Sequence, residues 1–138
     1  MKHQKLKYSG KPLSYWATQL KDRDPEYRKN AVTALVSFGP AGAGPLVEMV
    51  RTGDTESKRL AFTGLQQLVP DAADALPAII AALEDPDARV RAHAAICVGR
   101  FGPRAKETVP KLLNMVRDED AFVREVAVWT LWDVRSDP

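Results

Sequence analysis

The chain has 138 residues, enough for one domain with a hydrophobic core of its own. Hydrophobic residues make up 45% and charged residues 28%, so the composition excludes a disordered polar chain. One cysteine excludes an intrachain disulfide, and neither an apolar leader nor an apolar run of about 18 residues is present. We therefore expect a cytoplasmic protein without a membrane span.

Residues 1–11 are predicted to form a solvated basic arm. They include Lys2, Lys5, Lys7 and Lys11 and no acidic residue, whereas 12–138 hold 16 basic and 18 acidic side chains. The body of a nucleic-acid-binding domain is expected to be basic, so nucleic acid is not the favoured partner. Contact of the arm with phosphates or anionic lipid is the alternative.

Residues 12–138 are predicted to form one domain of four tandem helix pairs, at about 12–40, 41–70, 71–103 and 104–135. The first helix of each pair is a short apolar run with a proline near its start, and these runs cover 12–20, 44–50, 76–83 and 109–116. No strand pair with alternating apolar residues is evident, so an all-α fold without strands is expected.

The second helix of each pair is aligned on an alanine, which we call position 0. These alanines are Ala31, Ala61, Ala94 and Ala127, at spacings of 30, 33 and 33 residues. Apolar residues recur at positions 0, +1, +4 and +7, the spacing of one buried face of an α-helix. In the fourth pair this face holds Val128 and Leu131, which we expect in the core.

Charged residues recur at fixed positions before this alanine. Position −7 holds Asp24, Asp54, Asp87 and Asp120, and position −3 holds Arg28, Lys58, Arg91 and Arg124. Position −9 holds Asp22, Thr52, Asp85 and Asp118, whose side-chain oxygens suit helix N-caps. Pro25 and Pro86 each follow an aspartate and are expected at the first helical position.

These positions are predicted to form a structural ladder. In this interpretation aspartates cap the second helices, and a base from the same or the next repeat reaches an aspartate or a helix end. Such pairs fix the register between repeats at little net gain in energy. A phosphate track along one edge is the alternative, but the interspersed acids would cancel the field that attracts phosphate.

Three segments resemble the second half of a HEAT repeat, in particular the bacterial HEAT-like repeats first associated with phycobilisome lyases. They are LEDPDARVRAHAAICVGRFGP (83–103), RDEDAFVREVAVWTLWDV (117–134) and KDRDPEYRKNAVTALVSFGP (21–40). The second repeat departs most, because Thr52 and Lys58 replace the usual Asp and Arg. The resemblance implies a right-handed α-solenoid of four repeats, with the second helices on its concave side. It also implies a scaffold that binds a protein or peptide and is not an enzyme.

The outward positions +2 and +5 of the second helices are the candidate partner-binding surface. With Arg100 added, the candidate residues are Trp129, Trp132, Ile96, Arg100, Val36 and Gln66. Two exposed tryptophans one turn apart would anchor a partner or a second copy of the chain through the C-terminal repeat. The alternative is that one of them folds over the end of the stack as a cap. Trp16 is expected in the core or in an N-terminal cap.

No catalytic, metal-binding or cofactor-binding constellation is evident. His3 and His93 lie far apart, which gives no zinc spacing, and no third group orients His93 toward Cys97. We expect Cys97 to be a buried inert thiol and His93 to lie at the surface or between repeats. Two alternatives to a scaffold remain: a bilin lyase-like accessory enzyme, suggested by the family, and a nucleic-acid-binding protein.

Overall fold

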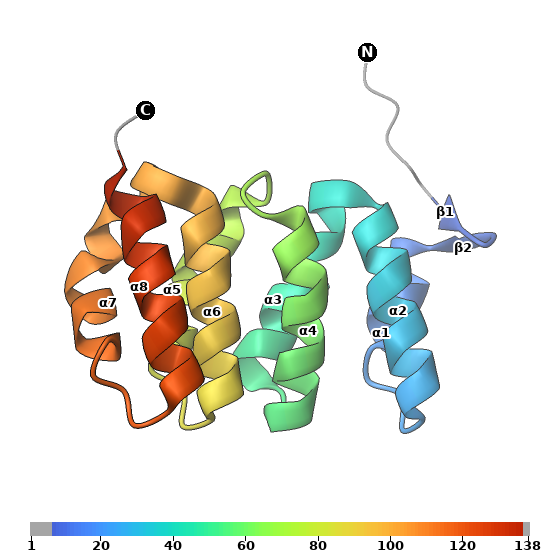
Figure 1. The fold of residues 1–138 in the computed structure, drawn as a ribbon. Coiled ribbons are helices and arrows are strands. Elements are labelled where there is room, and N and C mark those ends of the chain that lie inside the picture. Colours follow the sequence, from blue (N-terminus) through green and yellow to red (C-terminus); the bar gives the residue numbers. More distant parts are fainter. Residues whose placement is uncertain (1–6, 137–138) are drawn as a thin grey trace, which may run out of the picture.

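The computed structural model describes residues 7–136, which form a stack of helix pairs in two layers (Figure 1). The first helices, the A layer, are α1 (Leu13–Gln19), α3 (Ala43–Thr52), α5 (Leu76–Ala82) and α7 (Val109–Met115). The second helices, the B layer, are α2 (Pro25–Ser37), α4 (Thr55–Leu68), α6 (Ala88–Phe101) and α8 (Ala121–Arg135). The 3₁₀ helices η1 (Gly39–Gly42), η2 (Ala73–Ala75) and η3 (Gly102–Thr108) connect successive pairs. The predicted all-α solenoid is confirmed.

The B helices begin at the aspartates of position −7, not at those of position −9. The side chain of Asp24 accepts from the N–H of Glu26 at 2.9 Å, and Asp54, Asp87 and Asp120 cap α4, α6 and α8 in the same way. Expecting the cap at position −9 was therefore wrong. Pro25 is the first residue of α2 as predicted, but Pro86 precedes the cap residue Asp87 and lies outside α6.

The aspartates of position −9 instead shape the turn before each cap. Asp22, Asp85 and Asp118 each accept the backbone N–H two residues later, at 2.8 to 2.9 Å. Such Asx turns hold the backbone in the conformation that enters the helix. Thr52 differs, because its hydroxyl donates to the carbonyl of Glu48 inside α3.

Stacking of the repeats depends most on the B layer. Each B helix packs on the next, whereas in the A layer only α3 and α5 share a comparable set of contacts. The alanines of position 0 are fully buried, so each B helix lies close to its neighbours. The closer spacing of the B helices matches the concave side of a curved stack.

The fourth repeat is the last one within residues 7–136, and no described repeat covers its outer face. Position +1 is buried in the first three repeats, where it holds Val32, Phe62 and Ala95, but Val128 is 57% exposed. Leu131 at position +4 is partly buried, whereas its three counterparts are fully buried. Expecting these two residues in the core was wrong. In the first three repeats these positions are covered by the next repeat, and not by the helix pair to which they belong.

The N-terminal end carries a small hairpin that the all-α expectation missed. Strands β1 (Lys7–Tyr8) and β2 (Lys11–Pro12) pair antiparallel around Ser9 and Gly10. Both turn residues have positive φ, 50° and 79°, as a type I′ turn requires. The predicted residues Lys2, Lys5 and His3 lie outside the described residues.

Trp16 lies under this hairpin, as its expected role in an N-terminal cap requires. Its indole N–H donates to the carbonyl of Tyr8 at 3.2 Å, and the rings of Tyr8 and Tyr15 meet it edge to face. The ring is partly buried against the core. No helix of the described chain is long and apolar enough to cross a bilayer.

His93 and Cys97 both lie inside the stack on α6. The thiol of Cys97 is fully buried, and burial raises its pKa to about 12, so it is inert as predicted. The imidazole of His93 stacks on Phe62 of α4, which confirms its place between repeats. Its buried Nδ1 has no hydrogen-bond partner. Burial lowers the pKa of His93, and Arg89 lowers it further.

Gly64 tests how closely α4 packs on the first repeat. A Cβ at this position would lie 2.8 Å from Val32 Cγ1 and 2.9 Å from Leu46 Cδ1. We expect Gly64→Ala to lower the free energy of unfolding by about 1–3 kcal/mol in urea titrations, because overpacking outweighs the helix propensity of alanine. Gly44→Ala in α3 is the matched control, since no atom lies within 4 Å of its Cβ. Equal stability of the two variants would contradict this packing.

The buried imidazole of His93 predicts a loss of stability in weak acid. Its folded-state pKa is lower than the unfolded value of about 6.5, so the unfolded chain takes up the proton first. The free energy of unfolding should therefore fall as the pH drops below about 6.5. Urea titrations at pH 7.5 and 5.5 should show a smaller fall in His93→Gln than in the wild type. An equal fall in both chains would exclude His93 as its cause.

Candidate partner-binding site

The bases of position −3 link each repeat to the next one along the stack. Lys58 Nζ lies 2.7 Å from Asp85 Oδ2, and the guanidinium of Arg91 binds both carboxylate oxygens of Asp118 at 2.9 Å. Each base therefore reaches the position −9 aspartate of the following repeat. For Lys58 and Arg91, the aspartate that the base binds is therefore in the following repeat and is not the helix cap.

Arg91 and Asp118 make the most complete of these links. Arg91 Nη1 also donates to the carbonyls of Asp85 and Pro86, both at 2.9 Å, so the same side chain closes the turn of its own repeat. The hydrogen bond to Asp118 raises the pKa of Arg91. Burial alone would raise the pKa of Asp118, but the hydrogen bonds from Arg91 and from the N–H of Asp120 lower it overall.

The ladder is incomplete at its two outer bases. The second repeat has Thr52 at the position where the third and fourth have Asp85 and Asp118. Arg28 binds Glu56 instead, and its buried Nε has no hydrogen-bond partner. Arg124 donates through Nη1 to the carbonyls of Asp118 and Glu119, as Arg91 does in its own turn. No acceptor for Arg124 Nε or Nη2 is found among residues 7–136.

A groove lies on the B layer between α6 and α8 and collects half of the candidate residues. Ile96 and Arg100 of α6 line one side, and Trp129 of α8 lines the other. Phe122 and Val126 extend the apolar surface, while Glu125 and Asp133 place two carboxylates on the α8 side. Arg100 Nε points back toward the carbonyl of Val69, 3.4 Å away. The groove thus has an apolar wall with acidic groups along one rim.

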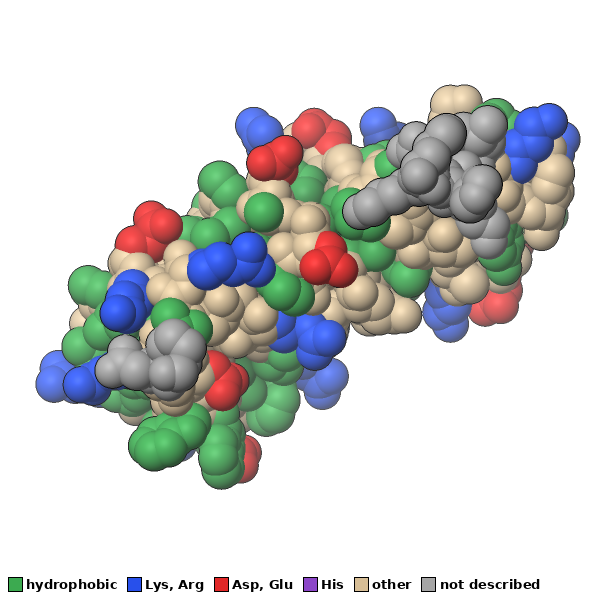
Figure 2. All heavy atoms as spheres, turned by 90° about the horizontal axis from the view of Figure 1, so that it is seen from above, with side chains coloured by type: hydrophobic (Ala, Val, Ile, Leu, Met, Phe, Trp, Pro, Cys, Tyr) green, Lys and Arg blue, Asp and Glu red, His purple; other side chains and the backbone are tan. Residues whose placement is uncertain are grey.

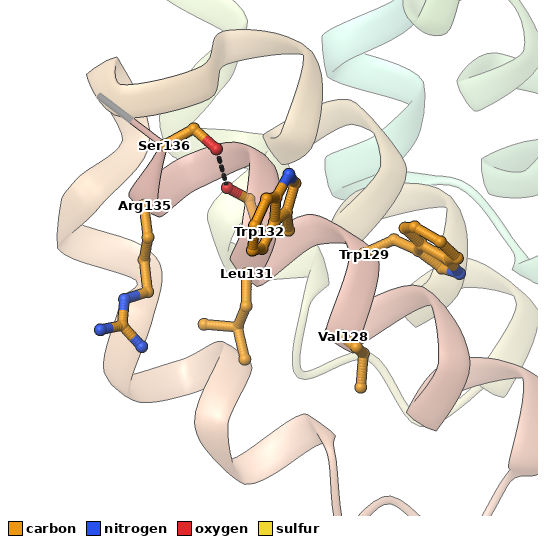
Figure 3. Close-up of a pocket in the computed structure, with 6 residues that line it drawn as sticks. All are labelled: Val128, Trp129, Leu131, Trp132, Arg135 and Ser136. Atoms are coloured by element: carbon orange, nitrogen blue, oxygen red, sulfur yellow. Dashed lines mark hydrogen bonds between the residues drawn. The ribbon is translucent and has the colours of Figure 1, made fainter. Parts of the chain in front are cut away.

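The two tryptophans of α8 are both exposed, and Trp129 belongs to two adjoining surfaces. Trp129 is 66% exposed and Trp132 is 73% exposed, so neither is buried as a cap over the end of the stack. Figure 3 shows Trp129 on one side of α8 and Leu131 with Arg135 on the other, with Trp132 between them. Trp129 lines the α6–α8 groove, and both tryptophans line a hollow at the end of the molecule.

That hollow lies on the side of α8 where a fifth repeat would stack. Its lining includes Val128, Leu131, Trp132 and Arg135. Figure 2 shows large hydrophobic side chains standing out at this end of the molecule. Trp129 also lines this hollow, so the end surface and the α6–α8 groove are adjoining candidate sites that share one residue.

A smaller groove between α2 and α4 takes in one more candidate. Val36 lines it together with Thr33, Leu60 and Thr63. Gln67 lines this groove, while Gln66 is half-buried beside it and does not. Val36 and Gln66 thus lie at the other end of the B layer from the tryptophans, and the six candidates do not form one site.

The HEAT-repeat family matches residues 43–132, which is more than half of the sequence. The chain belongs to the HEAT-repeat family. No curated protein matches it.

Solved structures resemble this HEAT-repeat chain in fold. An engineered protein, Northeast Structural Genomics Consortium target OR329, has a TM-score of 0.70 and 19% identity, over 89% of this chain and 62% of its own. A designed armadillo repeat protein in complex with the peptide (KR)4 has a TM-score of 0.70 and 18% identity, over 91% and 65%. A second designed armadillo repeat protein has a TM-score of 0.65 and 18% identity, over 89% and 64%. The chain therefore spans less than two thirds of the length of each.

Sequence reasoning missed Phe122, which is 52% exposed on α8. It stands at position −5, where the other three HEAT repeats have Glu26, Glu56 and Arg89. A large apolar residue in an otherwise charged column was the signal that could have identified it. No cluster of three or more metal-ligating side chains occurs in the described part of this chain.

Thr52 offers a test of how the ladder of this HEAT domain works. We expect Thr52→Asp to raise the free energy of unfolding by about 1 kcal/mol, since a charged hydrogen bond to Arg28 Nε outweighs an unfavourable charge at the end of α3. Urea titrations of a double-mutant cycle with Arg28→Lys, which lacks Nε, measure the coupling. If the gain survives in the Arg28→Lys background, the aspartate acts by another route.

Proposed function

We propose that this HEAT domain is a non-enzymatic scaffold that binds an extended peptide segment of a partner protein in the α6–α8 groove. The observation that carries the proposal is the exposed indole of Trp129, which faces Ile96 across a groove with acidic groups on its rim. Large exposed aromatic side chains are the residues on which peptide and protein interfaces most often depend.

The position of the groove supports this function. It lies on the B layer, the closely spaced side of the stack, where a solenoid offers an extended surface to a partner. The designed armadillo repeat protein of similar fold was solved in complex with the peptide (KR)4, so a solenoid of this fold can hold a peptide.

The chemistry of the groove indicates the kind of peptide that fits. Ile96, Phe122 and Trp129 provide an apolar surface for one large side chain. Glu125 and Asp133 outnumber Arg100 on its rim, so a basic residue next to that side chain meets a complementary charge. We therefore infer a ligand with an aromatic or branched aliphatic side chain flanked by Lys or Arg. The cytoplasmic location of the protein itself stays a prediction.

Selection from a random peptide library displayed on phage tests the proposal directly. We expect wild-type protein to enrich peptides that combine a large apolar residue with Lys or Arg. Fluorescence anisotropy of a selected peptide should then show a loss of affinity of at least about tenfold for Trp129→Ala, because the anchor of the groove is removed.

Trp132→Ala is the matched control, because Trp132 is on the same helix and as exposed but lies outside the groove. It should bind the selected peptide like the wild type. Glu125→Lys with Asp133→Lys should weaken binding and reduce its dependence on salt. Acidic consensus peptides, or equal binding by Trp129→Ala and wild type, would rule out this groove as the binding site.

A further inference from the structure

The exposed end of the last repeat carries the residues that internal repeats bury against their successor. Val128 and Leu131 occupy positions +1 and +4, which are covered in the first three repeats. Leu113 of α7 is also exposed, whereas its counterparts Val47 and Ile80 in the A layer pack against the core. Both layers thus expose apolar residues at the positions that form the interface between successive repeats.

The polar ladder is left open at the same end. Lys58 and Arg91 each bind the aspartate that precedes the next B helix. Arg124 has the same position and the same Nη1 bonds to its own turn, and no acid among the described residues meets its other nitrogens. An acidic side chain placed relative to Arg124 as Asp85 is to Lys58, or Asp118 to Arg91, would meet these nitrogens.

We propose that this end face is a docking site for a helix pair of a partner protein, with an acidic residue in the turn between the two helices. The face is formed by Leu113, Arg124, Val128, Leu131 and Trp132. The helix pair covers the apolar row as one repeat covers the next, and its acid completes the ladder at Arg124. The site adjoins the α6–α8 groove, since Trp129 lines both hollows, and it does not depend on the function proposed for the groove.

Charge argues for such a partner over a second copy of this chain placed face to face. Arg124 lies in the first turns of α8 and Arg135 at its end, so arginines flank the apolar row on both sides. A two-fold symmetric pair brings Arg124 against Arg124 or against Arg135 of the other copy. Like charges oppose this contact, whereas an acidic turn matches it.

The stack's own N-terminal end is an unsuitable occupant. The hairpin of residues 7–12 covers Trp16 of α1 there and forms a cap. No comparable element covers α8 within residues 7–136. A repeat from inside a stack, such as the third one of this chain, has the helix pair and the acidic turn that the end face requires.

The test adds such a helix pair to the full chain. A second copy of residues 71–103 follows Ser136 in place of 137–138, which puts the copied Ala94 33 residues after Ala127, the natural spacing. The copied Asp85 then faces Arg124. We expect a higher urea midpoint of unfolding and amide exchange in α8 slowed by at least about tenfold relative to the parent chain. Replacing the copied Asp85 with Ala should lose part of the gain.

Val128→Glu provides the decisive control. Val128 is largely exposed in the parent chain, so the change should leave the parent's urea midpoint unaltered. In the extended chain it should abolish the gain, because the glutamate would be buried in the new interface. Sedimentation velocity of the parent should show a monomer.

Two results would overturn the proposal. One is an extended chain with the parent's midpoint and unchanged exchange in α8. The other is a parent dimer that dissociates on Val128→Glu, since the end face would then belong to a second copy of this chain.

Discussion

Each helix pair of this protein buries its apolar side only by packing on the next pair, and the rest of the structure depends on that constraint. Alanine at position 0 lets B helices approach closely, and Gly64 carries the same close approach into the contact between α2 and α4. Because every contact is with a neighbour, the environment of a side chain depends on its place in the stack. Val128 has the chemistry of a core residue and the exposure of a surface one.

The charged ladder fixes the register in which successive repeats pack. Arg91 closes the turn of its own repeat with Nη1 and binds Asp118 of the next repeat with its remaining donors. Such a partly buried pair contributes little net stability, but it restricts how far two repeats can slide or rotate against each other. Arg59 with Asp87, and Lys111 with Glu84, add further links between neighbouring repeats.

The fold could be predicted because its signal is repeated. Four alanines in register, with apolar residues on one face, identify the B helices from local sequence alone. The cap was harder to place, because aspartates stand at both −9 and −7 and each accepts a backbone N–H near the helix start. The direction of the ladder depends on how one repeat lies against the next, which local sequence does not contain. The hairpin was missed because its strands have only two residues each.

The candidate site was predicted in part, for the same reason. Trp129 and Ile96 share a groove because the two helices that carry them are neighbours. Val36 and Gln66 stand at equivalent positions in other repeats, so alignment placed them in the same column while the stack separates them in space. Alignment of repeats identifies which residues occupy equivalent positions in their repeats, and not which residues contact one another.

Within residues 7–136, the last helix, α8, has a neighbour in the B layer on one side only, and it carries two surfaces of different charge. Successive helical residues are about 100° apart, so Trp129 and Glu125 face the groove while Val128 and Arg124 face the end of the stack. The groove side carries the carboxylates of Glu125 and Asp133, and the end side carries the guanidinium groups of Arg124 and Arg135. The basic peptide and the acidic helix pair that we propose would contact different sides of the same helix, and Trp129 lies at the border because it lines both hollows.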